Sequence, residues 1–279
     1  MDQSQLHDMQ KVFDSILSEV PDELIGLPRN GFISQEDKEF SCEIMKEVEA
    51  YIGVAASSDY YTTSRERFAV IIACARRYLR EGTLLDIGNA PGFLGYAFHK
   101  AGFEVSGLNL SDAYLEIYPN PEMVNLFNII SCDIEKTKLP FGDGMFDAIL
   151  FTEVLEHIAI KNPKEILIEF KRVLKPSGIV LFSTPNICNL SNIIALMTGN
   201  NVFWPENIFY GSTDRHNREY SPKEVRSLFE DSGFGVLEFF GVNDHANWRA
   251  GTQELIYPYL AKGREHPLLR NTIVGVFVS

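Results

Sequence analysis

The first eighty residues carry apolar side chains at helical spacing. Residues 1–20 and 35–52 each show one apolar stripe, and Pro21 ends the first of them. Apolar positions three and four residues apart fall on one face of an α-helix, and proline interrupts a helix. A third helix is predicted over 64–80, with Ser64 as its N-cap. The pattern therefore predicts amphipathic helices that cover the core or roof a site.

From Thr83 the pattern changes to short apolar runs that alternate with helical stripes. Strands are predicted over 83–87, 104–109, 128–131, 146–151, 178–183, 235–241 and 272–278. Strands that alternate with helices are typical of a parallel sheet covered by helices on both faces. The fold class is therefore predicted to be α/β, a Rossmann-like, doubly wound, mostly parallel sheet of seven strands.

Two of the intervening helices have clear ends. The helix over 162–175 begins with Asn162 as its cap and Pro163 in its first turn. The helix over 221–232 begins with the capping pair Ser221 and Glu224, and Gly233 stands at its C-terminal cap.

Two stretches, 187–220 and 242–270, do not fit the alternation. The first is rich in asparagine and aromatic residues, and both follow strands in the second half of the sheet. Open α/β sheets bind ligands beyond the carboxyl ends of their strands, so these insertions are candidates for a lid, with a packing elaboration or an oligomer contact as the alternative. The predicted organisation is an N-terminal helical extension over 1–64 and one domain over 65–279 that carries both insertions.

Charge and composition narrow the partners. The 279 residues contain 25 basic and 38 acidic side chains, a net charge of −13, which repels phosphate backbones and disfavours nucleic acid as a partner. The cysteines lack CxxC spacing, so neither a zinc site nor a disulfide framework is expected. With no secretion signal and no apolar run longer than FAVIIACA at 68–75, a cytoplasmic protein without a membrane span is predicted.

The stretch LLDIGNAPGFLGYAF, residues 84–98, places a glycine-rich turn between a strand and a helix. Glycine permits a tight turn and a close approach of a ligand to the backbone. Asp86 lies two residues before the first glycine, where a carboxylate organises the loop or reaches an ammonium group. The dinucleotide pattern G-x-G-x-x-G is absent, because Ala90 and Pro91 occupy its middle.

This turn resembles motif I of the class I S-adenosylmethionine-dependent methyltransferases. Three further blocks are similar to that family in the same order: CDIEKTKLPFGDGMFDAILFTEVLEHI at 132–158, RVLKPSGIVLFSTPN at 172–186 and HNREYSPKEVRSLFEDSGF at 216–234. The last block is similar to a segment of many small-molecule and sugar-modifying members. The resemblance implies that S-adenosylmethionine is the cofactor, so that the turn holds an adenosyl sulfonium instead of a pyrophosphate.

The resemblance also assigns residues to the parts of the cofactor. Around Gly88, Asn89 and Ala90 the backbone would cradle the methionine part. The ribose position, usually an acid, is Asn109, followed by Leu110; an amide accepts through one atom only, so weaker binding of the ribose is expected. Asp133 and the N–H of Ile134 would bind adenine, and Phe151 and Thr152 would close over the cofactor after the strand over 146–151.

The carboxylate of the cofactor needs a cation. Arg67 is the first candidate, with Arg65 and Tyr61 as rivals, since a guanidinium binds a carboxylate through two hydrogen bonds. The alternative is that Arg67 is a solvated arginine on a helix face.

Transfer to a hydroxyl requires a base that takes its proton. His157 follows the strand over 146–151 and suits this role, while His216 and His245 in the two lid candidates are alternatives. A structural role for His157 is the other interpretation, and Arg218 and Glu219 are expected to tie the lid down.

The segment E-x-x-E-H, formed by Glu153, Glu156 and His157, is similar to one that holds a divalent ion in the ubiquinone-pathway O-methyltransferases. Carboxylates near a helix N-terminus also have a simpler explanation in the helix dipole, so a divalent metal is kept as an alternative and no metal ligand is assigned.

The predicted function is O-methylation of a small molecule or glycan. The segment N-P-P-Y is absent after the strand over 146–151, where the chain reads F-T-E-V, and this argues against nucleic-acid and glutamine acceptors. An N- or C-methyltransferase, a nicotinamide-dependent oxidoreductase and a non-catalytic cofactor-binding partner subunit are the alternatives. A homodimer formed through the N-terminal helices is also considered.

Overall fold

The computed structural model describes residues 11, 33–197, 199–210, 215–242 and 270–279. The helix predicted over 1–20 lies outside these residues except for Lys11, and so does nearly all of the predicted 242–270 insertion.

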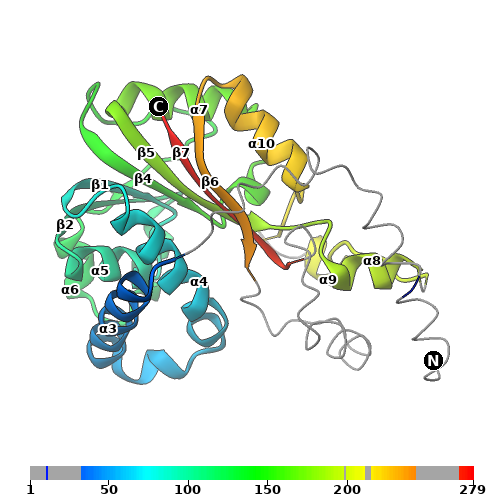
Figure 1. The fold of residues 1–279 in the computed structure, drawn as a ribbon, viewed down its shortest axis with the longest axis horizontal. Coiled ribbons are helices and arrows are strands. Elements are labelled where there is room, and N and C mark those ends of the chain that lie inside the picture. Colours follow the sequence, from blue (N-terminus) through cyan, green and yellow to red (C-terminus); the bar gives the residue numbers. More distant parts are fainter. Residues whose placement is uncertain (1–10, 12–32, 198, 211–214, 243–269) are drawn as a thin grey trace.

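One sheet of seven strands runs through the molecule in the order β3-β2-β1-β4-β5-β7-β6 (Figure 1). Its strands pair in parallel except that β7 runs antiparallel to both of its neighbours. The predicted mostly parallel, doubly wound sheet is therefore confirmed. The strands are β1 (Gly82–Ile87), β2 (Phe103–Asn109), β3 (Ile130–Ser131), β4 (Phe146–Thr152), β5 (Leu174–Pro185), β6 (Gly235–Val242) and β7 (Thr272–Val278).

Helices cover both faces of the sheet, as Figure 1 shows. The α-helices are α3 (Gln35–Ile52), α4 (Asp59–Arg76), α5 (Phe93–Lys100), α6 (Glu122–Leu126), α7 (Pro163–Val173), α8 (Leu190–Met197), α9 (Glu206–Phe209) and α10 (Pro222–Asp231), and short 3₁₀ turns are η1 (Gly53–Ser57), η2 (Asp112–Ile117) and η3 (Leu155–His157). Among the described residues, no helix is long and apolar enough to cross a membrane.

Side-chain alternation in the strands builds two apolar layers. In β1, Leu84 packs with residues of α3, α4 and α5, whereas Leu85 and Ile87 pack with residues of α7 and α10. Successive side chains of a strand point to opposite faces, so a central strand needs apolar residues on both. The helices α3, α4 and α5 thus cover one face of the sheet, and α7 and α10 cover the other.

Side-chain caps mark the start of α3, α4, α7 and α10. The predicted cap Asn162 accepts from the N–H of Lys164, and Ser221 and Glu224 form the predicted capping box. The predicted cap Ser64 is wrong: Ser58 caps α4 by accepting from the N–H of Tyr61, and Ser64 lies buried in the middle of that helix. The helix starts earlier because its first turn also packs on the core, which the stripe from 64 onward did not indicate.

The strand β5 also departs from the prediction. It begins at Leu174, earlier than expected, and its pairing with β4 shifts register between Phe146 and Ala148. The pairing with β4 resumes at Ile179, so residues 175–178 form an irregularity within β5.

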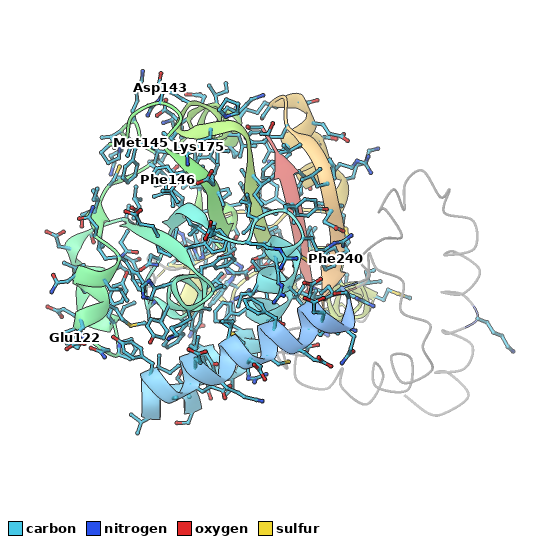
Figure 2. All side chains as sticks on the ribbon, turned by 60° about the vertical axis from the view of Figure 1, so that its left-hand side comes forward. Glu122, Asp143, Met145, Phe146, Lys175 and Phe240 are labelled. Carbon is cyan, nitrogen blue, oxygen red and sulfur yellow. The ribbon has the colours of Figure 1, made fainter. Side chains whose placement is uncertain are left out.

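The N-terminal edge of the sheet is closed by polar contacts. Asp147 accepts from the N–H of Thr83 at 2.8 Å and from Lys175 Nζ at 2.7 Å. Figure 2 shows Asp143, Met145 and Lys175 gathered at this end. The opposite, C-terminal edge carries the loops after β1, β4 and β5, and α8 and α9 lie in the predicted 187–220 insertion.

The proposed boundary between 64 and 65 falls inside α4, and α3 shares one core cluster with α4 and α5. The division into a helical extension over 1–64 and a domain over 65–279 stays a prediction, as does the lid role of the insertions.

The turn before α5 depends on a glycine. Gly92 has a φ of 88°, and a Cβ there would lie 2.8 Å from the Tyr118 ring. The change Gly92→Ala combines backbone strain with a steric clash, so we expect the free energy of unfolding to fall by about 2–4 kcal/mol.

Gly144→Ala is the matched control, because Gly144 also has a positive φ, 62°, but nothing lies within 4 Å of its Cβ position. It should cost about 1 kcal/mol in denaturant unfolding. Equal losses for both variants would show that Tyr118 does not constrain the turn.

Candidate functional site

A chain of buried hydrogen bonds ties together the ends of β1 and β2. Asn89 Nδ2 donates to Asp86 Oδ2 at 2.6 Å, and Tyr118 Oη donates to Asn89 Oδ1 at 2.6 Å. Asn109 Nδ2 donates to Tyr118 Oη at 2.9 Å, and Asn109 Oδ1 accepts from the Ala90 N–H at 3.0 Å. This polar network fixes the glycine turn on the neighbouring strand.

The network engages both polar atoms of Asn109, which is 1% exposed. The predicted ribose acceptor is therefore bonded to the turn and to Tyr118, while Leu110 beside it is 55% exposed. Tyr118 was not anticipated from the sequence, and no periodicity or motif marks it. Its position follows only from the tertiary contacts that Tyr118, directly after η2, makes with Asn89 and Gly92 of the turn.

Burial raises the pKa of Asp86 to about 7, although the hydrogen bond from Asn89 acts in the opposite direction. A carboxylate removed from water is costly in its charged form. Asp86, one residue before the end of β1, is therefore a carboxyl whose charge would respond to a cation beside it.

The turn packs closely against the end of β2 and the loop after β4. Gly88 has a φ of 75°, its N–H donates to the carbonyl of Leu108 at 2.7 Å, and a Cβ at this position would lie 2.8 Å from Val154. Only glycine therefore fits between the turn and the loop after β4.

Arg67 reaches the end of β4 from inside α4. The residue is 1% exposed, its Nη1 lies 2.7 Å from Glu153 Oε2, and its Nη2 donates to Ser64 Oγ at 3.0 Å. The rivals lie elsewhere: Arg65 Nε and Tyr61 Oη both donate to Glu49 Oε1 on α3. The alternative of a solvated Arg67 is thereby wrong, and Arg67 is the arginine of α4 that lies at the C-terminal edge.

Glu153 has an unusual backbone conformation. Its φ is 55°, a conformation that a non-glycine residue keeps only where its surroundings enforce it. Here Glu153 Oε1 accepts from Ser183 Oγ at 2.8 Å and its N–H donates to the Ser183 carbonyl at 2.9 Å. The Arg67–Glu153 pair thereby joins α4 to the ends of β4 and β5.

The predicted adenine side lies at the end of β3. Asp133 accepts from the N–H of Glu135 and pairs with Lys136 Nζ at 2.7 Å. Although partial burial opposes it, these contacts lower the pKa of Asp133. Ile134 is buried and its carbonyl accepts from Lys161 Nζ.

Beyond β4, Phe151 and Thr152 differ in position. The Phe151 ring packs in the core against Phe170, with centroids 5.0 Å apart, so only its backbone faces the C-terminal edge. Thr152 pairs in register with Ser183 at that edge.

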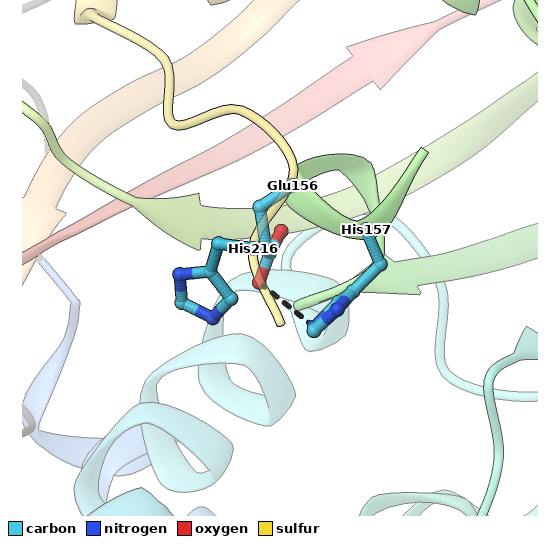
Figure 3. A group of neighbouring side chains, drawn as sticks. All are labelled: Glu156, His157 and His216. Atoms are coloured by element: carbon cyan, nitrogen blue, oxygen red, sulfur yellow. Dashed lines mark ion pairs between the residues drawn. The ribbon is translucent and has the colours of Figure 1, made fainter. Parts of the chain in front are cut away.

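Two of the three predicted base candidates lie together. The rings of His157 and His216 have centroids 5.1 Å apart, and Figure 3 shows Glu156 between them. The third candidate, His245, is outside the described residues. A segment distant in sequence thus brings His216 to the turn after β4.

Backbone hydrogen bonds hold this approach. The N–H groups of Asn217 and Arg218 both donate to the carbonyl of Glu156, and Asn217 Nδ2 donates to the carbonyl of His157. Arg218 itself pairs with Glu224 of α10, and the expectation that Arg218 and Glu219 tie down a lid stays a prediction.

Hydrogen bonds at Nδ1 orient both rings. His157 Nδ1 lies 3.1 Å from the carbonyl of Arg215, and His216 Nδ1 lies 3.1 Å from Glu219 Oε1. Both partners are acceptors, so each Nδ1 carries the proton in the neutral ring and Nε2 keeps the lone pair. Trp204 packs on His216 with centroids 5.1 Å apart and was not anticipated as a neighbour.

Glu156 is buried among these groups. Its Oε2 accepts from Thr184 Oγ1 at 2.9 Å, and its Oε1 lies 3.9 Å from His157 Nε2 with no hydrogen-bond partner among the described residues. Burial and then the charge of Glu153 raise its pKa well above the ordinary value. Ligand atoms of Glu156, His157 and His216 lie within 4.8 Å of one another, so this trio could hold a cation, whereas the predicted trio included Glu153.

Residues 85–182 match the family model described as a methyltransferase domain. The ubiquinone biosynthesis O-methyltransferase of Hydrogenovibrio crunogenus is 27% identical over 166 residues, which are 58% of this chain and 65% of that protein. The match therefore spans just under two thirds of the relative's length.

Two solved structures have similar folds. A SAM-dependent methyltransferase from Archaeoglobus fulgidus aligns with a TM-score of 0.54 and 16% identity over 80% of this chain and 95% of its own. The 1,6-didemethyltoxoflavin-N1-methyltransferase of Burkholderia thailandensis, solved with S-adenosylhomocysteine, aligns with a TM-score of 0.50 and 14% identity over 86% of each chain.

The buried carboxyl of Asp86 makes stability depend on pH. Its pKa is about 7 in the folded state, against an ordinary value of 3.8 for an aspartate in the unfolded chain. Its contribution to the free energy of unfolding is therefore full below pH 3.8 and is lost as the pH rises to about 7. Relative to Asp86→Asn, the wild type should lose about 1.4 kcal/mol per pH unit within this window.

Denaturant unfolding at a series of pH values measures this difference. Asp231→Asn, which alters an exposed helix-end carboxylate, serves as the control and should leave the slope unchanged. Parallel pH curves for wild type and Asp86→Asn would contradict the raised pKa.

Proposed function

We infer that this chain, a member of the class I S-adenosylmethionine-dependent methyltransferase family, transfers the methyl group of S-adenosylmethionine to a hydroxyl group of a small molecule or glycan. One observation carries the proposal: the C-terminal sheet edge combines a glycine turn backed by a buried acid with two oriented histidines from distant segments. The first feature suits a sulfonium cofactor, and the second suits a hydroxyl acceptor.

The methionine end of the cofactor fits the residues present. Arg67 offers a guanidinium for the carboxylate, and Asp86 offers a carboxyl for the ammonium. A bound ammonium would favour the charged form of Asp86 and lower its pKa. When bound, the cofactor supplies a methyl group already activated by its positive sulfur.

The residues expected to bind the ribose and the adenine of the cofactor already have partners within the protein. Asn109 is engaged by Ala90 and Tyr118, so it has at most one remaining N–H to offer the ribose, and no carboxylate stands in its place. Asp133 would have to exchange Lys136 for the adenine amino group. Affinity is therefore expected to rest more on the methionine end than on the ribose.

His216 is the better-supported base. Glu219 accepts from Nδ1, which keeps Nε2 as the acceptor and stabilises the ring when it gains the proton of the acceptor hydroxyl. His157 is oriented only by a neutral carbonyl, so it remains the alternative. Positioning of the acceptor, with Trp204 beside His216, would supply most of the rate.

A divalent ion is the second interpretation of the same cluster. Ligand atoms of Glu156, His157 and His216 lie within 4.8 Å of one another, and Glu156 Oε1 has no hydrogen-bond partner among the described residues, which a bound cation would satisfy. A metal would then lower the pKa of the acceptor hydroxyl. The relative from Hydrogenovibrio crunogenus is named for O-methylation, which supports a hydroxyl acceptor in either case.

The remaining alternatives differ in what they would bind or convert. An N- or C-methyltransferase would depend little on a base, and a partner subunit would bind the cofactor without turnover. A nicotinamide enzyme would bind the reduced nicotinamide and change its fluorescence. A glycan as the acceptor and a homodimer stay predictions.

Calorimetry with S-adenosylhomocysteine should show one site per chain, and titration with reduced nicotinamide should show none. Incubation of the protein with methyl-labelled S-adenosylmethionine and fractionated metabolites should then label a hydroxyl compound. Absence of binding to S-adenosylhomocysteine would refute the proposed function, and label on nitrogen or carbon would select the alternative acceptors.

Histidine variants separate the two candidate bases. We expect His216→Ala to lower kcat by about 10²–10⁴-fold, the usual contribution of a general base, and His157→Ala to lower it less. Cofactor affinity, measured by calorimetry, should stay unchanged in both variants.

The same assays after metal removal by a chelator test the second interpretation. Unchanged turnover rules out a metal, whereas a loss that added Mg²⁺ or Mn²⁺ restores would assign the cluster to metal binding instead of proton transfer.

A further inference from the structure

A closed cycle of hydrogen bonds joins the turn that carries His157 to the segment that carries His216. His157 Nδ1 donates to the carbonyl of Arg215 at 3.1 Å, and Arg215 Nε donates to Asn217 Oδ1 at 3.1 Å. Asn217 Nδ2 then donates to the carbonyl of His157 at 2.8 Å. The cycle returns to the residue from which it started, and Asn217 is the member that closes it.

The amide of Asn217 fits the cycle in one orientation only. Its oxygen faces the Nε of Arg215, which can only donate, and its nitrogen faces a carbonyl, which can only accept. Rotation of the amide by half a turn would place donor against donor and acceptor against acceptor. The side chain therefore uses both of its functions, and no isosteric residue supplies the same pair.

The backbone of Asn217 contacts the same turn. Its N–H donates to the carbonyl of Glu156 at 2.8 Å, so Asn217 supplies donors to two consecutive carbonyls at the end of η3. Carbonyls at a helix end lack partners within the helix. Here their partner comes from a residue 60 positions later in the chain, which fixes the distance between the two segments.

Arg215 is anchored on its other side. Its Nη1 donates to the carbonyl of Phe209 at 2.8 Å, and its guanidinium lies 4.6 Å from the centroid of the Phe209 ring. The cycle is thereby attached to α9. His216 lies between Arg215 and Asn217 in the chain, so its backbone is held from both neighbours.

These contacts are the main contribution of Asn217. The side chain is half-buried, and both of its polar atoms are bonded within the cycle. Its loss would therefore remove little apolar packing, but it would release the segment of His216 from the turn of His157.

We propose that Asn217 is a positioning residue: by closing the cycle through Arg215, it sets the two histidines against each other and beside Glu156. The assignment rests on the proposed function, because it takes this cluster as the part of the site that acts on the acceptor hydroxyl. Misplacement of a reacting group by about 1 Å can cost a factor of about 10² in rate, so a residue that only orients the histidines can control turnover.

Two substitutions separate the hydrogen bonds from packing. Asn217→Asp keeps the size of the side chain and an acceptor for Arg215, but it places an oxygen against the carbonyl of His157. Asn217→Ala removes both side-chain contacts. We expect both variants to lower the saturating rate of label transfer from methyl-labelled S-adenosylmethionine to the accepting metabolite fraction by about 10- to 100-fold. The Kd of S-adenosylhomocysteine, measured by calorimetry, should change less than about twofold.

Nuclear magnetic resonance of the histidine rings reads the positions directly. Each ring lies beside the other at 5.1 Å, so its proton signals depend on their mutual orientation. At one pH and without cofactor, the signals of His157 and His216 should move in both variants. The signals of His99, which packs on Tyr96 of α5, should stay in place. An asparagine that only stabilises the fold would leave the histidine signals and the rate of the folded protein unchanged.

Asn189→Ala is the matched control. Asn189 is also half-buried and also makes two side-chain bonds to the backbone, from Nδ2 to the carbonyl of Asn186 at 2.7 Å and from the N–H of Asn192 to Oδ1 at 2.9 Å. This variant should keep both the rate and the histidine signals of the wild type.

The outcomes divide clearly. Wild-type histidine signals in Asn217→Asp would overturn the assignment, and so would moved signals with an unchanged rate. A rate loss in Asn217→Ala that Asn217→Asp does not share would assign the effect to side-chain volume and overturn the hydrogen-bonded cycle. Failure of the wild type to bind S-adenosylhomocysteine refutes the proposed function instead, whereas the ring signals, recorded without cofactor, test the cycle by themselves.

Discussion

The site exists because β1 pairs in parallel with β2 on one side and with β4 on the other. All three carboxyl ends meet at one edge, yet the chain leaves β1 for α5 on one face and continues after β4 to α7 on the opposite face. The two loops diverge, and open α/β sheets bind ligands where such loops part. Each group argued to bind or react lies on these loops or is brought to them.

The polar groups at the C-terminal edge of the sheet lower the stability of the fold, and the rest of the molecule offsets that loss. Asp86 and Glu156 are buried carboxyls with raised pKa values, and Glu153 keeps a positive φ. Apolar layers on both faces of the sheet supply the stability that such groups consume. The opposite edge, where Asp147 pairs with Lys175, also holds a non-glycine residue with a positive φ, Ser177 at 62°.

Predictions that depended on local chemistry were the successful ones. Asn162 and Ser221 cap their helices because each side-chain oxygen lies close enough to accept from a free N–H in the first turn. This contact requires no residue from elsewhere in the fold. Ser64 failed as a cap because Ser58 satisfies the same local rule and tertiary packing of the first turn chose between them. Likewise β5 begins early because its pairing with β4 tolerates a bulge, which no local signal reports.

The sequence by itself determined the alternation of strands and helices, the glycine turn after β1 and the candidate histidines, because periodicity and turn chemistry act between near neighbours. Tertiary structure alone decided that Asn109 is bonded to Tyr118, that Arg67 and not Arg65 reaches the end of β4, and that His216 stands against His157. The last two contacts join residues far apart along the chain. In all three, the direction of the side chain is set by how the layers pack, which no short stretch of sequence contains.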